Sequence, residues 1–96
     1  MKVPKKVKIG CYDFTVNWED KPIQDNDLCC GIMSLNNHSI TLSSSMLADK
    51  IPETFLHEII HAIDDMYNLE LGENRVNVLG IQLYQVIKDN KLSFLN

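Results

Sequence analysis

The 96-residue sequence predicts a single α+β domain, in which a small antiparallel sheet of about three to four strands packs on two main helices. Residues 5–43 contain short stretches of alternating polar and apolar residues, which are typical of strands with one buried face. Residues 52–67 and 73–88 instead repeat apolar residues with the helical period. A chain of this length forms one modest core and has no room for a second domain.

The strand-rich half is expected to form two hairpins. Residues 5–9 and 12–18 alternate polar and apolar side chains, and Gly10 supplies the turn between them. Residues 19–27 are polar and contain a proline, so they are expected to form a loop. The second pair of strands covers residues 29–35, including two cysteines, and residues 39–43. Asn36-Asn37 is expected to make the tight turn between them, because asparagine tolerates positive φ.

The helical half begins after a connector at residues 43–51. Pro52 suits the first position of the first helix, where its missing N–H costs nothing. Asn68 is expected to end that helix just after Tyr67. A short link leads to the second helix at residues 73–88, and residues 91–96 form a C-terminal tail that is expected to pack on the domain.

Polar side chains of the first helix gather on one narrow strip, within an arc of roughly 120°. The strip consists of Thr54, His57, Glu58, His61, Asp64 and Asp65. No lysine or arginine occurs between Lys50 and Arg75. Three acids beside two histidines are electrostatically unfavourable unless a cation offsets their charge. The strip therefore predicts a cation site.

The strip contains the motif His57-Glu58-Ile59-Ile60-His61, the His-Glu-x-x-His signature of zinc metallopeptidases. Two histidines four residues apart stand one above the other on a helix, so both imidazoles can reach one metal ion. Glu58 is placed to take a proton from a zinc-bound water and not to ligate the metal. The alternative is a chance match on a surface helix.

A tetrahedral zinc ion with two histidines and a water needs a third protein ligand. Asp64 and Asp65 follow on the same helix, but Asp65 lies about 12 Å in rise beyond His57. It is expected instead to brace a histidine or to hold the following loop. Glu73 is favoured as the ligand because it opens a new helix that can fold back, with Glu70 as the next choice. The alternative is that Glu73 is a first-turn acid favoured by the helix dipole.

The second helix places Glu73, Asn77, Gly80 and Tyr84 on one face, by steps of four, three and four residues. Asn77 is expected to hydrogen-bond a ligating histidine, and Gly80 to let the two helices approach closely. Asn77 as an ordinary polar residue is the alternative. The same side is expected to continue as a core face made of Val76, Leu79, Leu83 and Ile87.

These motifs resemble the small gluzincin metallopeptidases of the ImmA/IrrE-like type, whose pattern is His-Glu-x-x-His followed by Glu-x-x-Ala-Asn-x-x-Ala. The resemblance covers roughly residues 31–84, with Val76 and Gly80 in place of the alanines. It extends to minimal members found in phages and Gram-positive bacteria. The resemblance implies a zincin-like fold and a peptide substrate bound as an added strand along a sheet edge within residues 29–43.

The expected function is that of a zinc-dependent metalloendopeptidase acting on a specific protein partner. Zn²⁺ would bind His57, His61 and Glu73, and Glu58 would be the general base. A different class stays open, namely a zinc-stabilised interaction module that binds a partner without cutting it. That module would need a fourth protein ligand and no role for Glu58. Hydrolysis of a non-peptide amide differs only in the substrate.

An oxyanion donor is also needed, and its candidates are Tyr12, His38, Tyr67 and Tyr84. For each of these residues, packing or a surface position is the alternative role.

Composition bounds the partners and the compartment. The net charge of −4 argues against nucleic acid and against anionic membrane surfaces. No apolar run follows the N-terminal lysines, so a signal peptide is not expected, and no run reaches transmembrane length. Three cysteines, two of them adjacent, suit reduced thiols better than a disulfide framework. The sequence therefore predicts a cytoplasmic protein.

Overall fold

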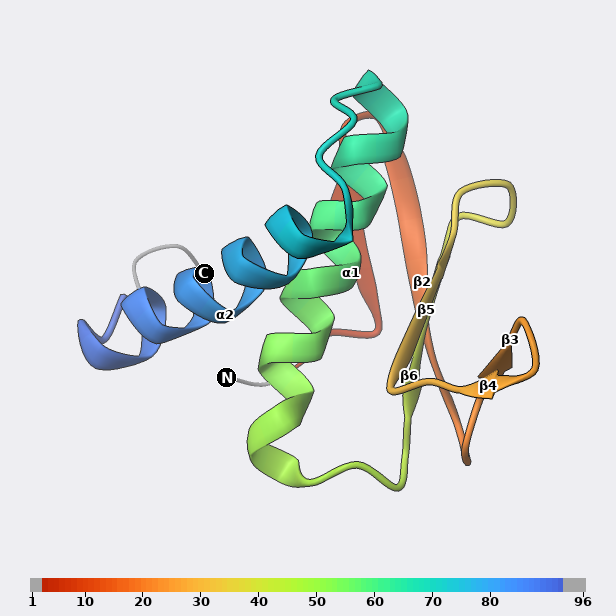
Figure 1. The fold of residues 1–96 in the computed structure, drawn as a ribbon, viewed down its shortest axis with the longest axis horizontal. Helices are drawn as coiled ribbons and strands as arrows, with labels where there is room; N and C mark the ends of the chain where they lie inside the picture. Colours follow the sequence, from red (N-terminus) through yellow and green to blue (C-terminus); the bar gives the residue numbers. More distant parts are fainter. Residues whose placement is uncertain (1–2, 93–96) are drawn as a thin grey trace.

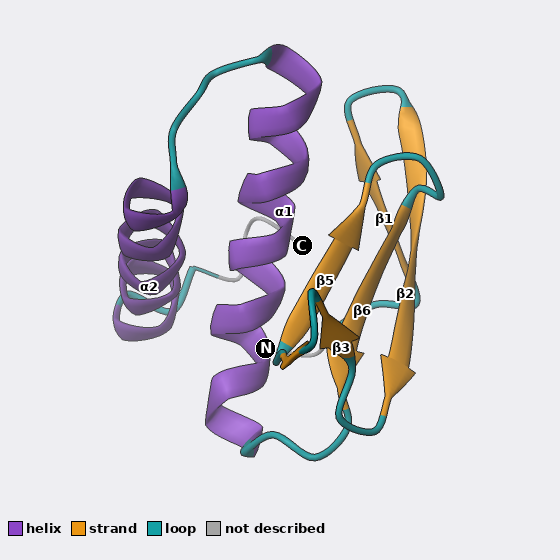
Figure 2. Cartoon of the chain, turned by 45° about the vertical axis from the view of Figure 1, so that its right-hand side comes forward, coloured by secondary structure: helices purple, strands orange, loops and turns teal. Residues whose placement is uncertain are grey.

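A computed structural model of the chain describes residues 3–92 and shows three layers, namely a sheet, a helix on one face of it, and a second helix on the far side of the first (Figures 1 and 2). The elements in chain order are β1 (Lys6–Ile9), β2 (Tyr12–Glu19), β3 (Ile23–Gln24), β4 (Asp27–Leu28), β5 (Gly31–Ser34), β6 (Ser39–Ser43), a 3₁₀ turn (Ala48–Lys50), α1 (Ile51–Tyr67) and α2 (Glu73–Asp89). The α+β class, the four-stranded sheet and the two helices are confirmed.

The main sheet is mixed, so the expected antiparallel sheet is wrong in one pairing. Its strand order is β1-β2-β6-β5. The two hairpins β1–β2 and β5–β6 are antiparallel, as predicted. The central strands β2 and β6, however, run parallel, from Thr15 opposite Ser39 to Glu19 opposite Ser43. This order leaves β5 at the edge of the sheet.

Local details of the strand-rich half differ from the prediction at three places. The expected loop at residues 19–27 includes a separate small hairpin of β3 and β4. Cys29 and Cys30 lie between β4 and β5 and not in a strand. In the turn from β5 to β6, the positive φ belongs to His38, at 47°, and not to the asparagines before it. The His38 ring packs 4.5 Å from the ring of Tyr12, measured between centroids, so contact with the sheet fixes this conformation.

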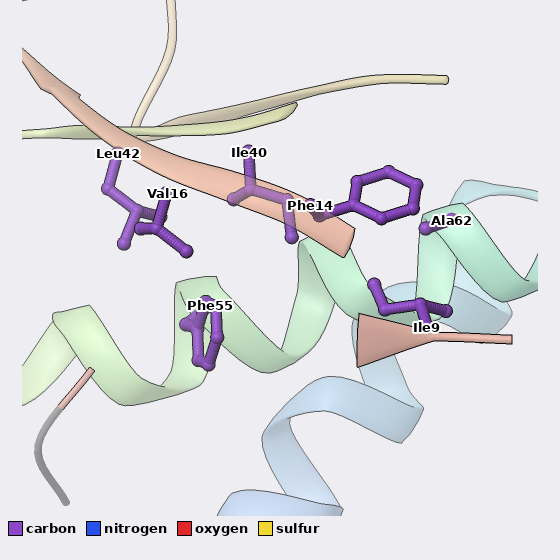
Figure 3. Close-up of a cluster of buried hydrophobic side chains, with 7 residues drawn as sticks. All are labelled: Ile9, Phe14, Val16, Ile40, Leu42, Phe55 and Ala62. Carbon is purple, nitrogen blue, oxygen red and sulfur yellow. The ribbon is translucent and has the colours of Figure 1, made fainter. Parts of the chain in front are cut away.

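The core lies between α1 and one face of the sheet (Figure 3). Alternate residues of the two central strands point to this face, and α1 covers them. The buried cluster consists of Ile9, Phe14, Val16, Ile40, Leu42, Phe55 and Ala62. Because Phe55 and Ala62 fix the rotation of α1 about its axis, the strip that carries the two histidines turns away from this cluster.

Both ends of α1 follow from the sequence. Pro52 lies in the first helical turn, one residue after the helix begins at Ile51. Asn68 adopts the left-handed conformation with φ of 52°, and its N–H donates to the carbonyl of Asp64. Asn68 therefore ends the helix as predicted.

The second helix packs on α1 through a narrower face than expected. Val76 and Gly80 are buried, but Leu79 is 41% exposed and Leu83 is 44% exposed. The predicted core face is therefore wrong for these two leucines, because α2 lies in the outer layer and has only α1 beneath it. Among residues 3–92, neither helix is long and apolar enough to cross a membrane. Of the expected tail, residues 91 and 92 are described: Leu92 is half-buried and its N–H donates to the carbonyl of Ile87 at 3.1 Å, whereas residues 93–96 lie outside the described part of the chain.

Candidate metal centre

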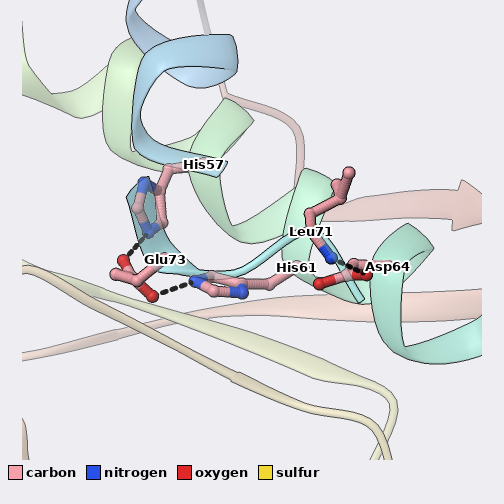
Figure 4. Close-up of polar contacts among 5 residues, drawn as sticks. All are labelled: His57, His61, Asp64, Leu71 and Glu73. Carbon is pink, nitrogen blue, oxygen red and sulfur yellow. Dashed lines mark hydrogen bonds and ion pairs between the residues drawn. The ribbon is translucent and has the colours of Figure 1, made fainter. Parts of the chain in front are cut away.

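His57, His61 and Glu73 converge at the crossing of α1 and α2 (Figure 4). The two imidazole rings are 4.7 Å apart between centroids and inclined at 68°. Nε2 of His57 lies 2.9 Å from Oε1 of Glu73, and Nε2 of His61 lies 3.0 Å from Oε2. One ligand atom from each of the three residues lies within 4.8 Å of the others. Tetrahedral zinc ligands at about 2.0–2.1 Å from the metal are roughly 3.3 Å apart, so the two distances from Glu73 to the imidazoles are close to the required spacing.

The helix start places Glu73, and not Glu70, beside the histidines. Glu73 is the first residue of α2, so its side chain projects from the helix end that reaches α1. Glu70 lies in the connecting loop, has a φ of 56° and is exposed. Among the described residues, these three are the one group of His, Cys, Asp or Glu side chains close enough together to share a metal ion. Its donor set of two imidazoles and one carboxylate is one that zinc accepts.

The loop before α2 is held by Asp64, whereas the sequence pointed to Asp65. The N–H of Leu71 donates to Oδ1 of Asp64 at 3.1 Å, and the N–H of Leu69 donates to the Asp64 carbonyl at 3.1 Å. Asp65 is exposed and lines a cavity beside the triad. The polar strip could not separate these two neighbours, because both fall within it. These contacts of Asp64 hold the loop that leads to Glu73 at the start of α2.

Glu58 is a buried carboxyl group, only 6% exposed, next to the triad. Burial raises its pKa to about 7, and the negative charge of Glu73 adds to this rise, while a backbone hydrogen bond from Met33 opposes it. The pKa of His57 is lowered, first by burial and then by His61, against the opposing charge of Glu73. Glu58 does not belong to the triad, so its carboxylate is available for a different role.

Two glycines make room for these side chains. A Cβ at Gly31 would lie 2.8 Å from Cγ2 of Thr54 and 3.1 Å from Oε2 of Glu58, so only glycine leaves space for this carboxylate. A Cβ at Gly80 would lie 3.2 Å from Cα of His57. The expected close approach of the helices at Gly80 is therefore present. Sequence reasoning missed Gly31, because a glycine at a strand start carries no sign of what approaches it.

Two cavities flank the triad, on either side of Glu58. The first, of about 240 Å³, is lined by Cys30, Gly31, Glu53, Thr54, His57, Glu58, Asn77 and Ile81. The second, of about 340 Å³, is lined by Gln24, Cys29, Gly31, Met33, His57, Glu58, His61, Asp65 and Glu73. Both cavities lie between β5 and the helices. Gly31, His57 and Glu58 line both of them.

The remaining sequence candidates do not reach the triad. Asn77 lines the first cavity beside His57, and no hydrogen bond joins it to either histidine among the residues described. The expected oxyanion donors Tyr12, His38, Tyr67 and Tyr84 line neither of these two cavities. Tyr12 and His38 pack on each other. The ammonium group of Lys88 lies over the Tyr84 ring, 5.9 Å from its centroid.

Comparison of the chain with protein-family models, with curated proteins and with solved structures finds no match. The relation to gluzincins therefore stays a prediction made from the motifs alone.

Glu58 is expected to make the stability of the metal-free protein depend on pH. Its pKa of about 7 in the folded state exceeds the ordinary value of 4.5, so the proton stabilises the fold. That contribution is complete below about pH 4.5 and is lost as the pH rises through about 7. Metal-free Glu58→Gln should therefore melt at a higher temperature than wild type at pH 8. Its free energy of unfolding should exceed that of wild type by roughly 3 kcal/mol at most.

Thermal melts in the presence of a chelator check this expectation at pH 4.5 and pH 8. His57 is present in both proteins, so its own titration cancels in the comparison. If the melting temperatures of the two proteins differed by the same amount at both pH values, the pKa of Glu58 would not be raised by folding.

The choice of third ligand predicts an order of effects on zinc affinity. Glu73→Ala should weaken zinc binding by more than Glu70→Ala or Asp65→Ala, because only Glu73 contacts both imidazoles. Asn77→Ala should cost at most on the order of 10–100-fold, as changes beside the ligands do. Competition with a fluorescent zinc chelator measures all four variants. If Glu70→Ala proved the most damaging, Glu73 would not be the ligand.

Proposed function

We propose that this chain is a cytoplasmic, zinc-dependent metallopeptidase of the gluzincin type, which hydrolyses a peptide bond in a specific protein partner. The observation that carries the proposal is the buried carboxylate of Glu58 beside a triad whose ligand atoms lie within 4.8 Å of one another. Structural zinc sites have four protein ligands, whereas catalytic sites keep one position open. Three converging side chains with an adjacent base fit the second arrangement.

Each side chain has a distinct part in the proposed reaction. His57, His61 and Glu73 would hold the zinc ion. Zinc bound there would polarise the peptide carbonyl and make a water molecule more acidic. The Glu58 carboxylate would accept a proton from the attacking water and return it to the nitrogen of the leaving amine. Gly31 leaves the space in which this carboxylate stands, and the backbone hydrogen bond from Met33 helps to position it.

The free edge of β5 supports an extended substrate. The N–H of Ser43 in β6 donates to the carbonyl of Cys30 at 2.8 Å. Because backbone groups alternate between the two sides of a strand, Gly31 and Met33 direct theirs to the free edge. The Met33 backbone already bonds Glu58, and the remaining groups can pair with an added peptide strand. The two cavities beside Glu58 would then receive side chains of that peptide.

The proposal is tested by looking for new peptide ends. The zinc-loaded protein is incubated with native cytoplasmic extract, and the products are compared with those formed by protein treated with a chelator. We expect a small set of new N-termini in the zinc-loaded sample alone, all within extended segments. A partner that is retained on the zinc-loaded protein but stays intact would favour the non-catalytic interaction module.

A further inference from the structure

The outer face of α2 exposes more apolar surface than an ordinary surface helix. We define this face as Arg75, Val78, Leu79, Gln82, Leu83, Val86 and Asp89. Four of these are large apolar side chains, with exposed fractions of 58% for Val78, 41% for Leu79, 44% for Leu83 and 42% for Val86. Figure 2 shows α2 on the far side of α1 from the sheet, so this face points away from the rest of the domain. Contiguous apolar surface of this kind marks an interaction site.

The face includes a hollow at its N-terminal half. The hollow has a volume of about 390 Å³ and is lined by Leu71, Asn74, Arg75, Val78 and Leu79. Its apolar floor suits a branched aliphatic side chain that projects from another helix, in the way that a knob enters a hole between two packed helices.

The charges at the two ends of the face oppose the dipole of their own helix. Arg75 stands in the first turn of α2, where a cation is unfavourable, and Asp89 is its last residue, where an anion is unfavourable. Within residues 3–92, neither forms an ion pair with an opposite charge; Asp89 accepts a hydrogen bond from Gln85 at 2.9 Å. Both charges would be stabilised by a partner that carries the opposite sign at each end.

A second α2 running antiparallel has that charge pattern. Arg75 and Asp89 lie seven residues on either side of Gln82, and Val78 and Val86 lie four residues on either side. Seven residues are two helical turns, so both charges fall on the same face. When two copies pair antiparallel about Gln82, each arginine meets the aspartate of the other copy. Val86 of the second copy then lies over Val78 and the hollow.

We propose that the outer face of α2 binds a second copy of this chain through an antiparallel helix pair centred on Gln82. An unrelated partner would not require charges placed symmetrically about one residue, whereas a two-fold axis does. Glu73 projects from the opposite side of α2 towards α1, so the pairing leaves the two cavities at the triad accessible. The proposal does not depend on the metal or on catalysis.

The test is the molar mass in solution, by sedimentation equilibrium of the full chain from about 10 µM to about 1 mM. A single pair of 17-residue helices makes a small interface, so we expect a weak dimer whose dissociation constant falls within this concentration range. The mass should rise from 11.0 kDa towards twice that value. Val78→Glu should keep the chain monomeric over this range, and the control Leu47→Glu, which changes a residue 72% exposed outside α2, should dimerise as wild type does.

A charge exchange tests the register. Arg75→Asp places two like-charged pairs in the dimer and should weaken it at least ~10-fold. The double variant Arg75→Asp/Asp89→Arg recreates both pairs with reversed sign and should restore the wild-type dissociation constant to within about threefold. Both variants place charges favourably for the helix dipole, so unfolding of α2 does not explain a loss. A wild-type monomer at all concentrations, a dimer indifferent to Val78→Glu, or a double variant as weak as the single one would overturn the proposal.

Discussion

Glu58→Gln is expected to lower the rate of peptide hydrolysis by at least ~10²-fold, while the zinc content stays at about one ion per chain. Glutamine keeps the size of the side chain and can still accept the backbone hydrogen bond from Met33, but it cannot take up a proton. Zinc analysis of the purified variant, together with turnover of a substrate found by the search for new peptide ends, measures both quantities.

Glu53→Gln is the matched control for this loss. Glu53 lies five residues before Glu58 on α1, lines the first of the two cavities beside Glu58 and makes an ion pair with Lys50 at 3.8 Å. The same chemical change there removes a carboxylate from the cavity wall but not the proposed base, so turnover should change little. A biological effect that survives Glu58→Gln, with no shortened protein in the wild-type sample, would favour the interaction module.

His61→Ala is expected to abolish tight zinc binding and to lower the melting temperature of the zinc-treated protein to that of the chelated wild type. Removal of one imidazole leaves two protein ligands. Because metal binding stabilises the folded state, a variant that no longer binds zinc loses that stabilisation. Metal analysis and thermal melts with and without zinc give both readouts.

His38→Ala serves as the control for His61→Ala, since His38 packs on Tyr12 and Phe14 and does not belong to the triad. Its loss should lower the melting temperature through lost packing, yet the variant should still bind one zinc ion. Full zinc occupancy in His61→Ala would show that the metal, if present, binds elsewhere.

The two histidines of the candidate site could be predicted from the sequence because of their spacing along one helix. His57 and His61 are held one turn apart by the helix itself, so no knowledge of the rest of the fold was needed to bring them together. Glu73 was favoured over Glu70 because a helix that starts there can fold back over α1, but the sequence left both glutamates open as the third ligand. Local geometry therefore predicted the two histidines, and the start of α2 in the structure decided the third member.

The direction of the central strands could not be predicted in the same way. Alternation in β2 and β6 shows which face of each strand is buried, but a buried face is compatible with either a parallel or an antiparallel neighbour. The prediction that Leu79 and Leu83 of α2 are core residues was wrong for a related reason. Helical periodicity finds apolar residues, yet it does not show whether another element covers them, and α2 has only one covering partner.

The three-layer arrangement determines which helix can separate from the rest of the domain. The sheet and α1 share a buried cluster, whereas α2 packs mainly on α1, with Val76 and Gly80 buried at that contact. Because α2 packs chiefly on α1, opening of α2 can leave the sheet and α1 packed together. A zinc ion shared by His57, His61 and Glu73 would close a short loop of chain and remove much of that freedom. The ion would then hold the start of α2 against α1 in addition to its part in the proposed reaction.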